Sequence, residues 1–229
     1  MIREQGIMKT EVVFNDSKSE RYLLRKVWDE SKPIVCLIMT NPSTADAVTV
    51  DMTVHYAICN LFKLGYGGMD ILNMTSEITA KLDAKNGICL SDTNLEYILR
   101  SAEPADKVII AWGKIGENNK KIKALQHSLL QKLTPFKDKM YLIANLDGDT
   151  GFHPLAPQIR FDWILVPFTM PDYLKDMEES TGGSNTGDLN SVEPTDNKGS
   201  VPVESKGNEP DDHARHYKGK RSKRDVMTA

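Results

Sequence analysis

The sequence predicts an α/β protein in which a central, mostly parallel four-stranded sheet lies between two layers of helices. Short apolar runs bounded by turn-forming residues are typical of buried strands. These runs alternate along the chain with longer segments whose apolar residues recur at helical spacing. Such an alternation is typical of a parallel sheet covered by helices on both faces. We therefore expect a three-layer α/β/α domain over residues 1–173.

The N-terminal part of the chain predicts a hairpin followed by the first central strand. A short strand over 11–14 and an edge-like strand over 21–28 flank the turn-forming residues 15–17. Six apolar residues then occupy positions 34–39, and the polar Thr40-Asn-Pro-Ser segment follows them. This apolar run predicts a buried strand that ends in a turn at the sheet edge.

The middle of the chain predicts one helix and the second central strand. Residues 50–64 form an amphipathic helix that stops at the glycine-rich 65–68, and residues 69–74 form the strand. Tyr56 lies off the apolar face of this helix, which comprises Val54, Ile58, Leu61 and Phe62. Residues 76–90 show little periodicity and predict a loop.

The rest of the folded part repeats the alternation. Residues 91–94 offer N-cap side chains for a helix that runs through Arg100. The further expected elements are a third strand over 107–112, a long helix over 117–133, a fourth strand over 140–144, and a helical turn or edge segment over 159–163.

The composition of the chain argues against several classes of protein, namely strongly basic, iron–sulfur and membrane-spanning proteins. The net charge of -3 provides no global basic field, although a local basic patch would suffice for DNA binding. Cys36, Cys59 and Cys89 are far apart, so we expect reduced, mostly buried thiols and no iron–sulfur cluster. No apolar run approaches the roughly 18 residues of a membrane span. The N-terminus lacks the apolar region of a signal peptide, so we expect a cytoplasmic protein without a membrane partner.

Residues 174–229 predict a disordered tail, because almost no aliphatic residues cluster there. The tail is acidic up to Asp212 and basic after it, at Arg215, Lys218, Lys220, Arg221, Lys223 and Arg224. The basic end could contact a nucleic-acid backbone, or the tail could be solvated without a partner.

Polar, turn-forming sequence follows all four predicted central strands. These segments are 40–43, 73–75, 112–114 and the loop that reaches 152–154. Each one alone could be ordinary loop chemistry. Because the carboxyl ends of parallel strands meet at one edge of a sheet, the four together predict a site there.

The chain contains a series of motifs: Met39-Thr-Asn-Pro-Ser-Thr-Ala-Asp46, Asp51-Met-Thr53, Asn73, Ala111-Trp-Gly113 and His153-Pro154. In these motifs, residues from about 20 to 170 resemble a bacterial and phage family, domain of unknown function 1643. The order of motifs is also similar, more distantly, to the uracil-DNA glycosylase superfamily. Thr40-Asn-Pro-Ser43 resembles its Gly-Ile-Asn-Pro-Gly motif, and Ile71-Leu-Asn73 resembles its Leu-Leu-Asn strand end. Ala111-Trp-Gly-Lys114 resembles a Leu-Trp-Gly strand end, and His153-Pro-Leu155 resembles a His-Pro-Ser motif.

The superfamily resemblance implies a uracil-DNA-glycosylase-like fold and a role for each matching residue. Asn41 would polarise the water that attacks the anomeric carbon, and Asn73 would hydrogen-bond the edge of an extruded base. His153 would stabilise charge on the departing base. Ser43 would contact a backbone phosphate, and Leu155 would fill the gap left by the flipped nucleotide.

The sequence departs from the superfamily in ways that leave alternatives open. The Gly-Gln-Asp-Pro-Tyr motif of its most active members is absent, and Leu155 stands where the family has Ser. An amide does not titrate, so Asp46 or Asp51 could be the general base. Asp51 could equally be a helix N-cap, and His153 could be a loop histidine with a backbone partner.

Three more residues complete the candidate site. Tyr56 is a candidate to stack on a base, whereas Trp112 could either do so or pack in the core. Lys114 begins a basic stretch that could contact phosphate or could be a solvated helix face; the other lysines are Lys120, Lys121 and Lys123.

These observations predict a monomeric hydrolase of N-glycosidic bonds that acts on an extruded, modified or damaged DNA base. No metal or cofactor motif is present in the sequence, and we expect neither. Two alternatives use the same pocket. One is an enzyme that processes a free nucleoside or nucleotide, and the other is a non-catalytic module that recognises a base or a nucleic acid.

Overall fold

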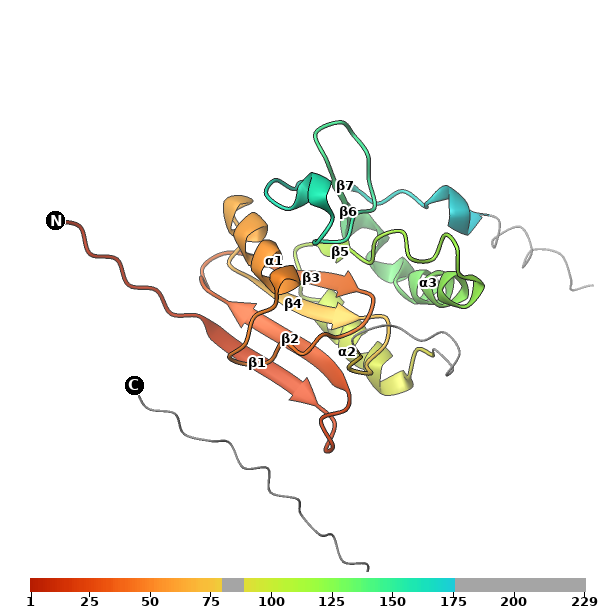
Figure 1. The fold of residues 1–229 in the computed structure, drawn as a ribbon, viewed down its shortest axis with the longest axis horizontal. Helices are drawn as coiled ribbons and strands as arrows, with labels where there is room; N and C mark the ends of the chain where they lie inside the picture. The colour runs from red at the N-terminus through yellow and green to blue at the C-terminus, as the bar shows by residue number, and fades with distance from the viewer. Residues whose placement is uncertain (80–88, 176–229) are drawn as a thin grey trace, which may run out of the picture. The chain divides into compact units, whose positions relative to one another are not determined.

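The computed structural model describes residues 1–79 and 89–175, which form an α/β fold around a mixed seven-stranded sheet (Figure 1). Almost all of the expected disordered tail, and the centre of the expected loop over 76–90, lie outside these residues. The elements are, in order, β1 Lys9–Phe14, β2 Arg21–Val27, β3 Ile34–Met39, α1 Met52–Lys63, β4 Gly68–Asn73, α2 Asp92–Ala102, β5 Val108–Ile110, α3 Lys120–Lys132, the 3-10 helix η2 Thr134–Lys139, β6 Met140–Ala144, the 3-10 helix η3 Pro157–Ile159 and β7 Ile164–Pro167.

The strands follow the order β1-β2-β4-β3-β5-β6-β7 across the sheet. β3 pairs in parallel with both β4 and β5, and β5 pairs in parallel with β6. The sheet is larger than the expected four strands, because β1, β2 and β7 extend the strands β4, β3, β5 and β6 with antiparallel pairs. The predicted hairpin is present, but β2 is internal because it pairs with β4 on its other side.

Several element boundaries also differ from the expected ones. β5 ends at Ile110, two residues early, because the chain turns at Gly113, which has a φ of +70°. α3 begins at Lys120 because the Asn119 side chain caps it, accepting hydrogen bonds from the N–H groups of Lys121 and Ile122. The segment expected over 159–163 divides into η3, which ends at Ile159, and the edge strand β7 after it.

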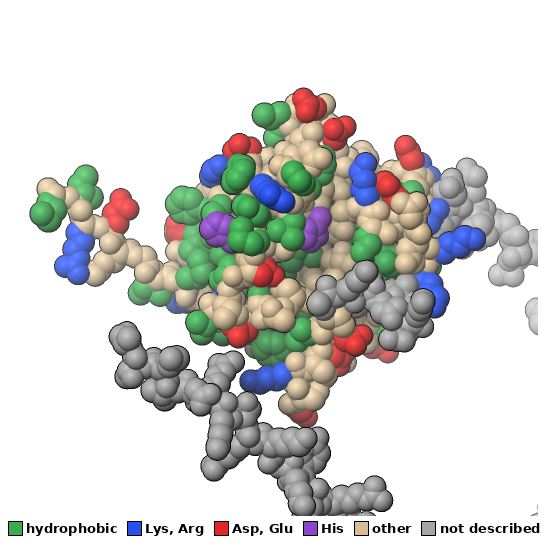
Figure 2. All heavy atoms as spheres, viewed as in Figure 1, with side chains coloured by type: hydrophobic (Ala, Val, Ile, Leu, Met, Phe, Trp, Pro, Cys, Tyr) green, Lys and Arg blue, Asp and Glu red, His purple; other side chains and the backbone are tan. Residues whose placement is uncertain are grey.

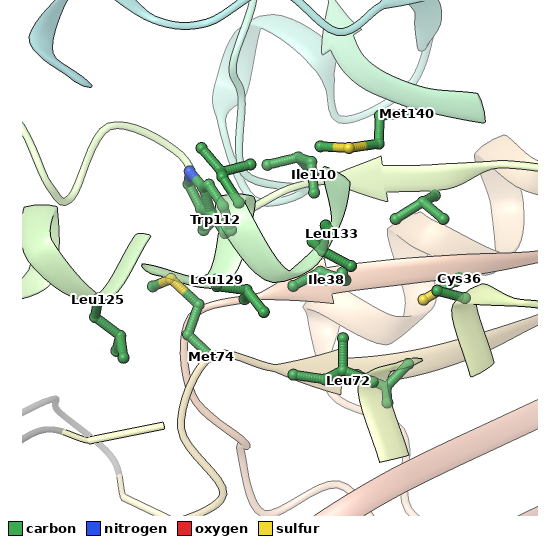
Figure 3. Close-up of a cluster of buried hydrophobic side chains, with 14 of the residues drawn as sticks. Cys36, Ile38, Leu72, Met74, Ile110, Trp112, Leu125, Leu129, Leu133 and Met140 are labelled. Carbon is green, nitrogen blue, oxygen red and sulfur yellow. The ribbon is translucent and has the colours of Figure 1, made fainter. Parts of the chain in front are cut away.

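The two faces of the sheet bury separate apolar clusters. Cys36 and Ile38 of β3 pack with α2 and α3, in the cluster that Figure 3 shows around Leu129 and Leu133. The alternate residues Val35, Leu37 and Met39 pack with α1 on the opposite face. This period-two alternation matches a strand that is covered by helices on both sides.

A β-bulge in β2 changes the direction of its first side chains. Val13 pairs with Leu23, but the next residue of β1, Phe14, pairs with Arg21, so Tyr22 is an extra residue. Leu23 and Tyr22 both point to the α2 side, where the Tyr22 ring stacks on Tyr97 with centroids 5.4 Å apart. Arg21 therefore points to the α1 side of the sheet.

The antiparallel pair of β2 and β4 contains an ion pair. Arg25 donates from Nε and Nη2 to the two carboxylate oxygens of Asp70, and both distances are 2.6 Å. The Asp70 side chain is 4% exposed and the Arg25 side chain is 38% exposed. The carboxylate is thus buried, and its charge is matched by an arginine at the surface.

Some expectations about individual side chains were wrong. Cys36 is buried, but Cys59 and Cys89 are exposed, so the thiols are not mostly buried. Phe62 was expected on the apolar face of α1, yet it is 61% exposed at the last turn of the helix. Within residues 1–79 and 89–175, no helix has the length and apolar character to cross a membrane. In the same residues, no cluster of three His, Cys, Asp or Glu side chains could hold a metal ion.

Candidate functional site

A small cavity of about 40 Å³ lies beside the carboxyl end of β3. Its walls come from β2, the end of β3, the segment that follows β3, the first turn of α1 and the loop after β6. The residues that line it are Arg21, Met39, Asn41, Ser43, Asp51, Thr53, Val54 and His153. The structure thus brings four predicted site residues into one cavity, namely Asn41, Ser43, Asp51 and His153, and adds Arg21.

Arg21 is a charged residue of the cavity that the sequence did not predict as a site residue. Its side chain is almost fully buried, since the residue is 2% exposed. Nη1 donates to the carbonyl of Ala45 at 2.7 Å, and Nη2 lies 3.4 Å from Oδ1 of Asn73. Among residues 1–79 and 89–175, the Nε–H has no hydrogen-bond acceptor. Burial lowers the pKa of Arg21 to about 10, and the nearby Asp51 carboxylate opposes this shift, so the guanidinium stays charged at neutral pH.

Asn41 and Ser43 present hydrogen-bonding groups to the cavity from the turn after β3. Asn41 donates from Nδ2 to the carbonyl of Thr79 at 2.7 Å, which leaves its Oδ1 as the acceptor that this amide can offer to a ligand. The hydroxyl oxygen of Ser43 accepts from the N–H of Ala45 at 3.3 Å, so its O–H remains a possible donor.

The two candidate general bases occupy different positions. Asp51 lines the cavity and also caps α1, because its Oδ1 accepts from the N–H of Val54 at 2.8 Å. Asp46 is not among the residues that line the cavity. Its Oδ1 accepts from the N–H groups of Val48 and Thr49, and these bonds hold the pKa of Asp46 below its usual value. Asp51 is therefore the carboxylate that a ligand in this cavity would meet.

His153 lines the cavity in a defined tautomer. Its Nδ1 accepts a hydrogen bond from the N–H of Leu155 at 3.2 Å, so in the neutral ring the proton is on Nε2. Burial lowers the pKa of His153, and the Asp51 charge opposes that shift. At neutral pH the ring is therefore an uncharged donor through Nε2. A Cβ at Gly113 would lie 3.1 Å from the Cβ of His153, so glycine permits this close approach.

Protonation of His153 is expected to destabilise the fold at mildly acidic pH. The folded pKa is lower than the unfolded value, so the unfolded chain binds more protons as the pH falls. Stability from the neutral ring is present above about pH 6.5 and is lost as the pH falls towards the folded pKa. NMR titration of the imidazole protons should give a midpoint below 6.5 for His153. A midpoint above 6.5 would contradict the assignment of a neutral ring.

Asn73 lies behind the cavity rather than in its wall. It is 1% exposed, and its Oδ1 faces Nη2 of Arg21, while its Nδ2 has no partner in the part of the chain that the structure describes. Its backbone carbonyl accepts from the side chain of Asn94 at 2.8 Å. In this arrangement Asn73 orients Arg21 and makes no direct contact with the cavity.

Tyr56 lies at the surface next to the loop that carries His153. The Phe161 ring meets it edge-on at 5.9 Å, and the Arg160 guanidinium lies 5.9 Å from the Tyr56 ring centre. Leu155 is 38% exposed and Phe161 is 68% exposed. Figure 2 shows hydrophobic side chains beside the histidines on the face in view. Tyr56 is thus already engaged in ring contacts and is outside the cavity wall.

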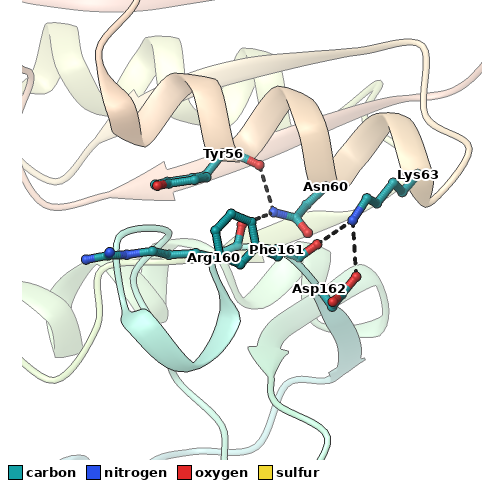
Figure 4. Close-up of polar contacts among 6 residues, drawn as sticks. All are labelled: Tyr56, Asn60, Lys63, Arg160, Phe161 and Asp162. Carbon is teal, nitrogen blue, oxygen red and sulfur yellow. Dashed lines mark hydrogen bonds and ion pairs between the residues drawn. The ribbon is translucent and has the colours of Figure 1, made fainter.

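Hydrogen bonds fasten the loop after His153 to α1 (Figure 4). Asn60 donates from Nδ2 to the carbonyls of Tyr56 and Arg160, at 2.9 and 2.8 Å. Lys63 donates to the carbonyl of Phe161 at 2.6 Å and pairs with Asp162 at 3.1 Å. These bonds tie the loop that carries His153 to the helix that Asp51 caps.

Trp112 and Lys114 line a different and larger cavity of about 500 Å³. Trp112 is 4% exposed and packs in the cluster with α2 and α3 (Figure 3). Lys114 is exposed and lies 3.9 Å from Glu117. The segments 40–43 and 152–154 thus contribute to the small cavity and 112–114 contributes to the larger one, whereas no residue of 73–75 lines either cavity.

The comparisons with known proteins identify one family. The family described as protein of unknown function (DUF1643) matches residues 21–155. That range contains every residue that lines the small cavity. No curated protein matches the sequence, and no solved structure does.

Proposed function

The chain belongs to the DUF1643 family, and from that premise we propose that its small cavity hydrolyses an N-glycosidic bond to a nucleobase. The single observation that carries the proposal is the set of three groups around one cavity: the Asp51 carboxylate, the neutral His153 ring and the buried Arg21 cation. Cleavage of such a bond needs a general base that takes a proton from the attacking water. It also needs hydrogen-bond donors that stabilise the charge on the departing nucleobase.

The volume of the cavity indicates that the water and the nucleobase occupy different positions. About 10 to 15 Å³ of cavity volume is enough for one water molecule, and this cavity measures about 40 Å³. It has room for the attacking water but not for a nucleobase. The base therefore lies at the mouth of the cavity, beside the loop that carries His153.

Four of the side chains that line the cavity each have one role in this reaction. Asp51 accepts the proton of the water through the oxygen that does not cap α1. Asn41 orients the water through its Oδ1, since Nδ2 donates to the carbonyl of Thr79. The electron pair of the C–N bond leaves with the base, which departs as an anion and takes a proton from the solvent. His153 donates a hydrogen bond from Nε2 to this departing base, and the positive charge of Arg21 stabilises the negative charge that develops.

Release of free base tests the proposal. Oligonucleotides that carry uracil, hypoxanthine or 5-modified cytosine, in single- and double-stranded form, would be incubated with the full chain and then treated with alkali. Nucleosides and nucleotides of the same bases would be assayed in parallel by chromatography. We expect free base from at least one substrate and a large loss with His153→Ala. Absence of base release from every substrate would remove the hydrolase proposal.

A non-catalytic base-recognition pocket is the second candidate. The observation in its favour is that the Asp51 carboxylate already caps α1, a structural role that needs no proton transfer. Binding of an oligonucleotide or a free base at the mouth of this cavity, weakened by Arg21→Met and not accompanied by base release, would favour this candidate.

A further inference from the structure

We propose that the small cavity is also a binding site for inorganic phosphate, selected over sulfate by Asp51. The inference goes beyond base cleavage, because it concerns an anion that the cavity binds whether or not a base is present. Four features carry it: the buried Arg21 cation, further donors around it, one carboxylate in the same wall, and the volume of the cavity.

Arg21 supplies a buried positive charge without a contacting counter-ion. No carboxylate of the described residues lies within ion-pair distance of its guanidinium, and its Nε–H has no acceptor. An unpaired charge in a protein interior is costly, and so is an unsatisfied buried donor. An oxyanion in the cavity that Arg21 lines would supply the missing negative charge.

Further donors lie in the same wall. The hydroxyl groups of Ser43 and Thr53 line the cavity and can rotate towards an oxygen. Thr53 belongs to the first turn of α1, a 12-residue helix whose N-terminal end carries a partial positive charge. The neutral His153, which also lines the cavity, adds an N–H donor at Nε2. The wall thus offers several donors to a tetrahedral oxyanion.

The Asp51 carboxylate decides which oxyanion is accepted. A carboxylate repels an anion unless that anion donates a proton to it. Orthophosphate keeps a P–OH proton at neutral pH and can donate it to Asp51, whereas sulfate has no proton to donate. A phosphate monoester has lost its second proton above about pH 6 and is excluded for the same reason. The combination of Arg21 and Asp51 therefore favours free phosphate.

The cavity is large enough for this ligand. Its volume of about 40 Å³ is a few times what one water molecule requires, at about 10 to 15 Å³. A single tetrahedral anion fits within that range, and a larger organic group does not.

Calorimetric titration of the full chain at pH 7.5 with sodium phosphate, sodium sulfate and glycerol phosphate tests the inference. We expect orthophosphate to bind at least about 10-fold more tightly than either of the other anions, because only it donates a hydrogen bond to the carboxylate. Equal affinity for phosphate and sulfate would overturn the inference, and so would absence of phosphate binding or equally tight binding of glycerol phosphate.

Two variants assign the roles. Asp51→Asn keeps the helix cap and adds an amide donor, so sulfate should bind within about 3-fold of phosphate. Arg21→Met should abolish the binding of both anions. Lys26→Met is the matched control, because Lys26 is a buried cation on the same strand that does not line the cavity. It should leave the phosphate-to-sulfate ratio unchanged.

The test remains decisive if Arg21→Met fails to fold, since the Asp51→Asn ratio and a loss of phosphate affinity in Ser43→Ala are measured independently. If Asp51→Asn still prefers phosphate by about 10-fold, Asp51 is not the selector and the inference is wrong. Phosphate binding is measured without any base, and base release is measured without phosphate. Failure of one proposal is therefore distinguishable from failure of the other.

Discussion

Asp51→Asn is expected to lower the rate of base release by about 10²- to 10⁴-fold, which is the usual contribution of a positioned general base. An amide in the same place accepts hydrogen bonds but cannot take up the proton of the attacking water. The Asn side chain still caps α1, so the free energy of unfolding should fall by less than about 1 kcal/mol.

Single-turnover measurements of base release, together with urea unfolding, separate the two effects. Asp92→Asn is the matched control, because Asp92 is an exposed residue in the first turn of α2 and is not part of the cavity wall. It should leave the rate unchanged. If Asp51→Asn releases base at the wild-type rate, then Asp51 is only a helix cap.

Arg25→Met is expected to destabilise the fold by about 3 kcal/mol, the lower end of the cost of leaving a buried charge without its partner. The Asp70 carboxylate is 4% exposed and would lose both of its hydrogen bonds to arginine. Because Arg25 is partly exposed, water can reach the vacated region and moderate the loss.

Urea denaturation of three variants checks this value. The double variant Arg25→Met with Asp70→Leu should recover most of the lost stability, because no buried charge remains. Lys9→Met is the control, since it removes an ion pair with Glu30 in which both side chains are exposed, and it should cost less than about 1 kcal/mol. If Arg25→Met lowers the free energy of unfolding as little as Lys9→Met does, the Arg25–Asp70 pair contributes no more than an exposed ion pair.

Local signals in the sequence were sufficient for much of the fold. The apolar run over 34–39 and the run over 140–144 coincide with β3 and β6. Asp51 and Ser91 cap α1 and α2, as their residue types predict. The convergence of parallel strand ends also placed Asn41 and His153 in one cavity, although 112 positions separate them along the sequence.

The remaining features depend on contacts that a single sequence does not display. Arg21 stands at the start of a strand among alternating residues, where a charged side chain is normally exposed. The bulge at Tyr22 and the approach of Ala45 bury it, and neither has a local sequence signal. Asn73 is predicted to bind a base; at the end of β4 its Oδ1 faces Arg21, and it does not line the small cavity. Trp112 and Lys114 follow a strand end that serves the other cavity.

The bulge in β2 also determines how this hairpin tolerates insertions and deletions. Opposite Val13 and Phe14, β2 carries one residue more than its partner strand needs, and that surplus residue is Tyr22. Loss of Tyr22 would restore regular pairing while Arg21 kept its orientation towards α1. Insertion of one residue between Arg21 and Tyr22 would instead move the arginine away from the bulge. The inserted side chain would then occupy the position that Arg21 has now. The length of this short segment, and not only its composition, therefore controls whether the cavity contains a cation.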